Sequence, residues 1–315
     1  MNVENRNRKA IAVVLRASIF LIAVAGLGLL AMQWGAARGF MLFVAGRAGS
    51  CSLAQSIRSP RETADQIARF QRISKSSRLI RKDDNGLELW ETEQGPFWII
   101  SNNQSQWFFL FLAEQGSDIY RHREAGVRPG DIVLDCGAHY GLFARKALRA
   151  GARLVVAIEP ASLNLECLRR NLAKEIAEGR ATVYPKGVWD KDDYMTLSID
   201  HQESGATSFV FHREGTSRVE KVPLTTIDKL VAELNLPRVD FIKMDIEGAE
   251  RQALAGARST LARFRPRMSL CVYHLPDDPL VIPKVVKEAQ PQYRQACGIC
   301  TDWGWRIRQE VEHFY

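Results

Sequence analysis

A glycine-containing segment in the middle of the chain has residues suited to binding a nucleoside. The segment DCGAHYG, residues 135–141, follows the apolar run IVL, and its glycines allow a tight turn from a strand into a helix. The missing side chain at Gly137 lets a ligand approach the backbone. Glu159 lies 24 residues beyond Asp135, where a carboxylate can accept hydrogen bonds from both hydroxyls of a ribose. This spacing predicts a cofactor that contains a nucleoside.

The acidic residue that opens this segment favours one class of cofactor over another. The pattern is DxGxxxG rather than the GxGxxG of dinucleotide-binding proteins. A carboxylate at the end of the strand would repel a pyrophosphate but attract the ammonium group of a methionine moiety, so S-adenosylmethionine is favoured over NAD. We expect the cofactor to contact the glycine segment, the acid after the second strand and the residues after the third strand. The candidates are Asp135, Gly137, Ala138, His139, Gly141, Glu159, Gly187 and Val188.

A second group of candidates follows two later apolar runs and could move a proton. Asp245 and Glu247 come directly after VDFIKM, and His274 comes after RMSLCVY. The imidazole of His274 is suited to removing a proton near neutral pH, although it could instead be a loop histidine bonded to Asp277 or Asp278. Asp245 and Glu247 are rival bases, weakened by the low pKa of an ordinary carboxylate.

Two further patterns carry less chemistry. Glu250 opens a helix, where a carboxylate most often caps backbone amides. The pair Cys297 and Cys300 has no second pair at the spacing of a zinc finger, so we predict no zinc site there. A divalent metal between the acidic residues and a catechol-like substrate is an alternative, but no ligand spacing compels it, and no metal is predicted.

These residues must be positioned by alternating strands and helices. Apolar runs read as buried strands, separated by amphipathic segments that read as helices, which indicates a parallel sheet covered on both faces. The expected strands are 131–135, 153–159, 181–185, 239–245 and 267–273, and the expected helices are 141–151, 162–179, 225–234 and 248–264. The fold class is therefore α/β, a doubly wound Rossmann-like sheet. Before it, the runs LELW, FWII and WFFLF, within residues 87–111, suggest a small layer of aromatic strands.

The N-terminal part differs from the rest in charge and hydropathy. Residues 1–82 carry a net charge of +11 and residues 83–315 a net charge of −4. Residues 17–37 are uncharged over about one bilayer span, so we expect a membrane anchor, with a signal peptide and a buried helix as alternatives. The basic residues beside it favour a membrane surface over nucleic acid as a partner. Six scattered cysteines suggest a reducing compartment.

Three segments of the chain resemble the FkbM-type S-adenosylmethionine-dependent methyltransferases. They are GDIVLDCGAHYGLF, AIEPASLNLECLRRNL and the stretch from VPLTTIDKL to GARSTL, and IKMDIEGAE is the most specific element. The resemblance covers about residues 115–293. It implies a class I methyltransferase fold and O-methylation of a hydroxyl on a sugar or polyketide-like natural product. It also implies cofactor contacts by Asp135, Gly137, Gly141 and Glu159, and an acidic signature at Asp245, Glu247 and Glu250.

The chain also departs from this family. His139 stands where the family usually has asparagine, Tyr273 and His274 stand where many members have an acidic residue, and the tail after Tyr293 does not resemble the family's closing strands. We expect an anchor over residues 1–46, a basic linker or juxtamembrane helix over 47–82 and the methyltransferase domain over 83–315. We expect the protein to be membrane-associated, with the catalytic domain on the cytoplasmic side.

The predicted function is methyl transfer from S-adenosylmethionine to a hydroxyl of a sugar, glycolipid or related natural product. The sulfonium is already activated, so the enzyme needs mainly alignment and one base. The partners are a small-molecule or glycan acceptor and a membrane surface, without nucleic acid. The alternatives are a nicotinamide-dependent oxidoreductase on the same kind of sheet and a non-catalytic, membrane-tethered binding module.

Overall fold

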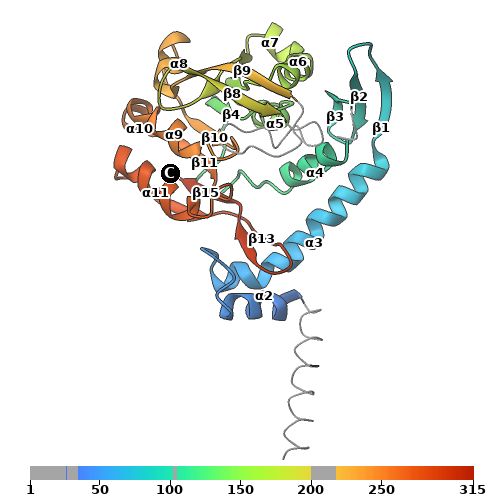
Figure 1. The fold of residues 1–315 in the computed structure, drawn as a ribbon, viewed down its shortest axis with the longest axis vertical. Helices are drawn as coiled ribbons and strands as arrows, with labels where there is room; N and C mark the ends of the chain where they lie inside the picture. The colour runs from blue at the N-terminus through green and yellow to red at the C-terminus, as the bar shows by residue number, and fades with distance from the viewer. Residues whose placement is uncertain (1–25, 27–34, 102–104, 200–217) are drawn as a thin grey trace, which may run out of the picture. The chain divides into compact units, whose positions relative to one another are not determined.

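The computed structural model describes residues 26, 35–101, 105–199 and 218–315 (Figure 1). The chain divides into two compact units. The smaller unit contains residues up to Ala64 together with Cys300–Arg308, and the larger contains Asp65–Ile299 and Gln309–Tyr315. Each is described by itself below.

A seven-stranded sheet forms the centre of the larger unit. Its order is β12 (Gln295–Cys297), β15 (Val311–Phe314), β11 (Arg267–Cys271), β10 (Phe241–Met244), β4 (Ile132–Cys136), β5 (Leu154–Ile158) and β6 (Ala181–Tyr184). The run from β11 to β6 is parallel, and β15 is antiparallel to both of its neighbours. The α/β Rossmann-like fold predicted from the alternating pattern is confirmed.

Helices cover both faces of this sheet because each carries one apolar side. On one face lie α8 (Ile227–Glu233), α9 (Glu250–Ala255), α10 (Arg258–Phe264) and α11 (Asp278–Ala289); on the other lie α5 (Leu142–Arg149) and α6 (Ser162–Asn171), with α7 (Ala173–Ala177) after them. The helix expected over 248–264 is interrupted near Gly256, where a Cβ would lie 2.1 Å from the carbonyl oxygen of Trp189. The sequence patterns also missed α11.

The tail after Tyr293 completes the sheet, although it does not resemble the family's closing strands in sequence. Strands β12 and β15 pair with each other, and β15 pairs with β11. Between them the chain makes a separate hairpin, β13 (Cys300–Asp302) and β14 (Ile307–Gln309). This inserted hairpin separates the two strands in the sequence, which hides their pattern.

A three-stranded antiparallel sheet precedes the central one, made of β1 (Arg78–Lys82), β2 (Leu87–Thr92) and β3 (Gly95–Ile100). The third aromatic run, WFFLF, is not a strand as expected but lies in α4 (Ser105–Gly116). Its aromatic residues pack on several sides against the small sheet and against Tyr140. A helix that is apolar around most of its surface has no clear period, which explains the error.

Asn171 connects the three-stranded sheet to the glycine segment by hydrogen bonds. Its side-chain oxygen accepts from the Trp98 backbone N–H at 2.6 Å. Its side-chain amide donates to the carbonyls of Trp98 and Tyr140, each at 2.9 Å.

A third sheet, of β7 (Gly187–Val188), β9 (Arg218–Thr225) and β8 (Asp193–Ile199), follows β6.

The smaller unit contains α2 (Gly35–Val44), the first half of α3 (Leu53–Ser76) and the hairpin of β13 and β14. Helices α2 and α3 meet at Gly39, where a Cβ would lie 1.9 Å from the Ser56 carbonyl oxygen. A disulfide joins Cys51 to Cys300. Disulfides persist in oxidising environments, so this bond argues against the reducing compartment expected from the cysteine count.

The localisation predicted from the sequence needs correction. In the part of the chain that the structure describes, every helix is too short or too polar to cross a membrane. This finding contradicts the membrane-associated localisation. Most of the apolar stretch over 17–37, on which the anchor prediction rested, lies outside the described residues.

Candidate functional site

A cavity opens at the carboxyl edge of the central sheet, where the strands end and ligands of open α/β sheets bind. Most of the residues predicted from the sequence line it. The described residues around it are Gly137, His139, Ile158, Glu159, Pro160, Asn164, Gly187, Val188, Leu197, Asp245, Ile246, Glu247 and Ala249. The ends of β4, β5, β7 and β10 are thus brought together around one space.

Gly137 is required by a close approach of two strand ends. Its φ of +77° lies in the left-handed region, and a Cβ would lie 2.0 Å from the backbone oxygen of Asp245. The amides of Gly137 and Ala138 both donate to the Ile158 carbonyl at 3.0 Å. The space that the sequence pattern reserved for a ligand at Gly137 is therefore filled by the neighbouring backbone. Ala138 is buried, and Gly141 begins α5 where its φ is +85°.

Glu159 is buried and holds the surrounding loops. One carboxylate oxygen, Oε1, accepts from the Ala161 N–H at 3.0 Å and the Asn164 side-chain amide at 3.3 Å. The other, Oε2, accepts from the His139 N–H at 2.9 Å. Burial raises the pKa of Glu159 above its ordinary value, and these hydrogen bonds oppose that rise. Because a carboxylate has about four acceptor positions, one position on Oε2 is left for a ligand.

Two cavity residues other than glycine adopt the left-handed backbone conformation, His139 with φ of 50° and Glu247 with φ of 54°. Such conformations cost energy for residues with a Cβ, and they often occur where a side chain must be aimed at a site. The His139 ring stacks on Tyr140 with 3.6 Å between ring centres. Burial, aided by the charge of Lys243, lowers the pKa of His139 to about 3, so this ring is neutral at physiological pH.

Asp135 lies beneath the cavity and does not line it. Its side chain is fully buried, and its Oδ1 lies 3.3 Å from the ammonium nitrogen of Lys243, which is 4% exposed. Lys243 stands beside Asp135 in the parallel register of β10 and β4, and it also donates to the Gly137 carbonyl at 2.7 Å. The positive charge that faces Asp135 is thus this lysine. Sequence reasoning missed Lys243, although a lysine inside the apolar run VDFIKM was a signal.

The Oδ2 atom of Asp245 accepts a hydrogen bond from the hydroxyl of Tyr120 at 2.7 Å. Burial would raise the pKa of Asp245, but the charges of Lys243 and His274 and this hydrogen bond lower it overall. The carboxylate is therefore ionised at neutral pH. Nothing in the sequence pointed to Tyr120, which precedes its partner by 125 residues.

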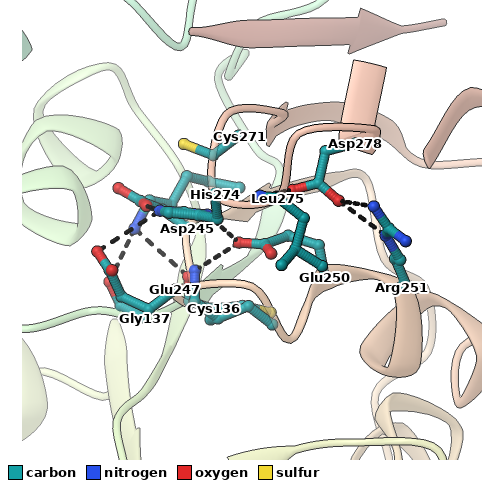
Figure 2. Close-up of polar contacts among 12 residues, drawn as sticks. Cys136, Gly137, Asp245, Glu247, Glu250, Arg251, Cys271, His274, Leu275 and Asp278 are labelled. Atoms are coloured by element: carbon teal, nitrogen blue, oxygen red, sulfur yellow. Dashed lines mark hydrogen bonds and ion pairs between the residues drawn. The ribbon is translucent and has the colours of Figure 1, made fainter. Parts of the chain in front are cut away.

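His274 is surrounded by carboxylates (Figure 2). Its Nδ1 lies 2.9 Å from Oε1 of Glu250, and its Nε2 lies 3.4 Å from Oδ1 of Asp245 and 3.5 Å from Oε1 of Glu247. Burial disfavours the charged ring, but Glu250 and Glu247 raise the pKa of His274 well above its usual value. A ring that is already protonated near neutral pH cannot accept a proton, so this arrangement does not favour His274 as the general base.

Glu250 has two partners for one oxygen. Its Oε1 accepts from the Ile246 N–H at 2.9 Å as well as from His274. The first contact holds the loop after β10 rather than capping an amide of α9, so the helix-capping role expected from the sequence is not seen, and the second joins α9 to the loop after β11. Asp277 and Asp278, considered as partners of His274, instead pair with Arg251.

Comparisons with known proteins support the assignment of the fold. The family model of the methyltransferase FkbM domain matches residues 135–293, which include all the candidate site residues. The 31-O-demethyl-FK506 methyltransferase FkbM of Streptomyces tacrolimicus is 25% identical over 182 residues, 47% of this chain and 67% of that protein.

Solved structures give weaker likenesses. The crystal structure of a methyltransferase FkbM from Methylobacillus flagellatus KT has 19% identity and a TM-score of 0.45, over 81% of this chain. The chain covers 59% of that structure, less than two thirds of its length. The METTL16 methyltransferase domain has 9% identity and a TM-score of 0.38, over 64% of this chain and 65% of its own. On the family match, which spans half of its residues, this chain belongs to the FkbM family of methyltransferases.

Proposed function

We propose that this protein transfers a methyl group from S-adenosylmethionine to a hydroxyl oxygen of a sugar, glycolipid or related natural product. The observation that carries the proposal is the cavity in which Glu159, the glycine segment and the pair Asp245 and Glu247 meet. One side of this cavity has a carboxylate suited to a ribose, and the other has carboxylates suited to a reacting hydroxyl.

In this arrangement Glu159 binds the ribose of the cofactor through the acceptor position left on Oε2. Gly187 and Val188, together with Leu197, provide an apolar wall. Such a surface suits an adenine ring, whose faces are apolar. Asp135 has no direct contact with the cofactor and instead holds Lys243, which supports the Gly137 carbonyl.

The reaction is an in-line attack of the hydroxyl oxygen on the methyl carbon. The new O–C bond forms as the C–S bond breaks, and its electron pair stays on sulfur, which becomes a neutral thioether. The hydroxyl loses its proton on the side of Asp245 and Glu247, which both line the cavity. Alignment supplies most of the rate, because the sulfonium is already a good leaving group.

Replacing Glu159 by glutamine is expected to raise the dissociation constant of S-adenosylhomocysteine about 10- to 50-fold, since a hydrogen bond to a charged group contributes about 1.5–3 kcal/mol. Isothermal titration calorimetry measures this. The matched control is Glu220→Gln, because Glu220 also accepts a backbone amide, that of Ser162, but does not line the cavity. Unchanged affinity in a folded Glu159→Gln protein would remove Glu159 from the cofactor site.

The Asp245→Asn substitution is expected to lower turnover about 100-fold while changing S-adenosylhomocysteine affinity less than about threefold, because it removes a negative charge beside the reacting hydroxyl. The control is Asp240→Asn at the opposite end of β10, where the carboxylate accepts from the Ile132 N–H. Equal turnover in the two variants would show that Asp245 takes no part in the chemistry.

The activity itself is tested with methyl-labelled S-adenosylmethionine and a set of sugar, glycolipid and polyketide hydroxyl acceptors. Label must appear in an alkali-stable ether, as expected for an O-methyl group. Binding of NADH in place of S-adenosylhomocysteine would favour the oxidoreductase alternative.

A further inference from the structure

We propose that Asp245, Glu247 and His274 form a binding site for a divalent cation at the edge of the cavity. Nothing in the sequence spacing indicated such a site. The three side chains come from the ends of two neighbouring strands, β10 and β11, and one potential ligand atom from each lies within 4.8 Å of the other two. Figure 2 shows them facing one another.

The distances suit a shared ion. Ligands that each lie about 2.1 Å from one ion are about 3.0–3.5 Å apart when they occupy adjacent positions. The Nε2 atom of His274 lies 3.4 Å from the Asp245 carboxylate and 3.5 Å from that of Glu247. Two carboxylate oxygens and one imidazole nitrogen make a donor set that first-row divalent ions such as Mn²⁺ accept.

A second observation points to a ligand at the same place. The His274 side chain is 3% exposed, and its Nε2 makes no hydrogen bond of normal geometry among the described residues; its contacts with Asp245 and Glu247 are ion pairs of 3.4 and 3.5 Å. A buried polar atom without a well-formed hydrogen bond is costly, so a ligand at this point would satisfy it.

Glu250 orients the ring for a metal. It accepts from Nδ1 of His274 at 2.9 Å, which holds a proton on that nitrogen and directs Nε2 toward Asp245 and Glu247, so a cation would displace the proton from Nε2 and bind its lone pair. A carboxylate behind a histidine is the usual support of a metal-ligating imidazole. Glu250 is fully buried and also held by the Ile246 N–H, so the ring has little freedom to turn away.

Charge and access are consistent with a cation. The cluster has three carboxylates, those of Asp245, Glu247 and Glu250, around one imidazole. The nearby ammonium of Lys243 is paired with Asp135, which offsets its repulsion of a cation. Asp245 and Glu247 line the cavity, so an ion bound by them would have coordination positions open to a substrate.

The catalytic role of this ion depends on the proposed function. A divalent cation would bind the acceptor hydroxyl and lower its pKa, so that the proton leaves to water as the oxygen attacks the methyl carbon. This removes the need for a histidine base. The acceptor would then be a compound whose hydroxyl has a second oxygen beside it, since two adjacent oxygens chelate a hard cation better than one.

The test is titration of the full chain with Mn²⁺ alone, without cofactor, followed by electron paramagnetic resonance of free and bound ion. We expect one bound Mn²⁺ per chain, with a nitrogen coupling in pulsed spectra that His274→Gln abolishes. Asp245→Asn should abolish binding, and Glu250→Gln should weaken it about 10- to 100-fold. The control, Asp277→Asn, changes an acid of the same loop that pairs with Arg251 and should bind normally.

Absence of stoichiometric binding to the folded wild-type chain at millimolar Mn²⁺ would overturn the proposal, as would equal binding by the Asp245→Asn chain. Circular dichroism establishes that each variant is folded. S-adenosylhomocysteine binding is measured separately by calorimetry. If the chain bound Mn²⁺ but not S-adenosylhomocysteine, the metal site would be supported and the proposed function contradicted. If it bound S-adenosylhomocysteine but not Mn²⁺, the proposed function would be supported and the metal site contradicted.

Discussion

Replacing Lys243 by methionine is expected to lower the free energy of unfolding by about 3–5 kcal/mol, the cost of leaving one charge of a buried pair without its partner. Asp135 is fully buried, and the Lys243 ammonium lies 3.3 Å from it. Methionine fills a similar volume, so the loss comes mainly from the charge and from the hydrogen bond to the Gly137 carbonyl. Urea denaturation followed by circular dichroism measures the change.

A double-mutant cycle isolates the pair. The Asp135→Asn substitution alone should also destabilise, because it leaves the ammonium unpaired, whereas the double variant should recover much of the summed loss. The control Lys284→Met affects an exposed pair with Glu288 and should cost less than about 0.5 kcal/mol. If the double variant lost as much unfolding free energy as the two single variants together, Asp135 and Lys243 would not act as a pair.

The loss in the Lys243→Met protein should also depend on pH. Burial already raises the pKa of Asp135 in the folded state, and Lys243 opposes that rise, so its removal raises this pKa further. A folded-state pKa above the unfolded one favours folding at low pH, and that contribution is lost as the pH rises through the folded-state pKa. The deficit of the variant should therefore be full at neutral pH and shrink on acidification, as the Asp135 carboxyl takes up a proton.

The Gly137→Ala substitution is expected to destabilise the protein by about 3 kcal/mol or more and to abolish S-adenosylhomocysteine binding. Alanine at a φ of +77° costs about 1–2 kcal/mol in strain. Its Cβ would also lie 2.0 Å from the Asp245 carbonyl oxygen, which forces β4 and β10 apart at the site. Overpacking of this kind adds about 1–3 kcal/mol. Thermal and urea unfolding measure the first effect, and calorimetry measures the second.

Gly130 provides a matched control for this substitution. Its φ is +86°, but a Cβ there would meet no atom within 4 Å. The Gly130→Ala protein should therefore lose only the strain term, about 1–2 kcal/mol, and keep its affinity for the cofactor product. If the two alanine variants were equally stable, the close contact with Asp245 would not be what requires glycine at position 137.

The central sheet could be predicted because its strands are continuous apolar runs. Residues 132–135, 154–158 and 241–244 lie within the strands expected from the sequence, and acidic and glycine residues at the ends of these strands meet at one cavity. The aromatic run in α4 was misread because its pattern has no clear period. The interrupted closing strands were not recognised because the β13 and β14 hairpin lies between them.

The details of the site depend on information that a single sequence does not carry. Lys243 has a role only because the register of two parallel strands sets it beside Asp135, and Tyr120 reaches Asp245 across 125 residues. His274 was expected to act as a base because it follows a strand of the sheet, and the alternative was a loop histidine bonded to Asp277 or Asp278. Its actual neighbour, Glu250, lies 24 residues earlier and changes the charge of the ring.

The position of β15 has a consequence for synthesis of the chain. This strand lies between β11 and β12, both of which are made before it, and all four of its residues are buried. Until residues 311–314 have left the ribosome, β11 and β12 have no shared partner, and the edge of β11 presents unpaired backbone groups that can join other chains. A nascent or prematurely terminated chain that lacks Val311–Phe314 is therefore expected to aggregate readily, because the sheet is completed only when β15, its last strand in the sequence, inserts between β11 and β12.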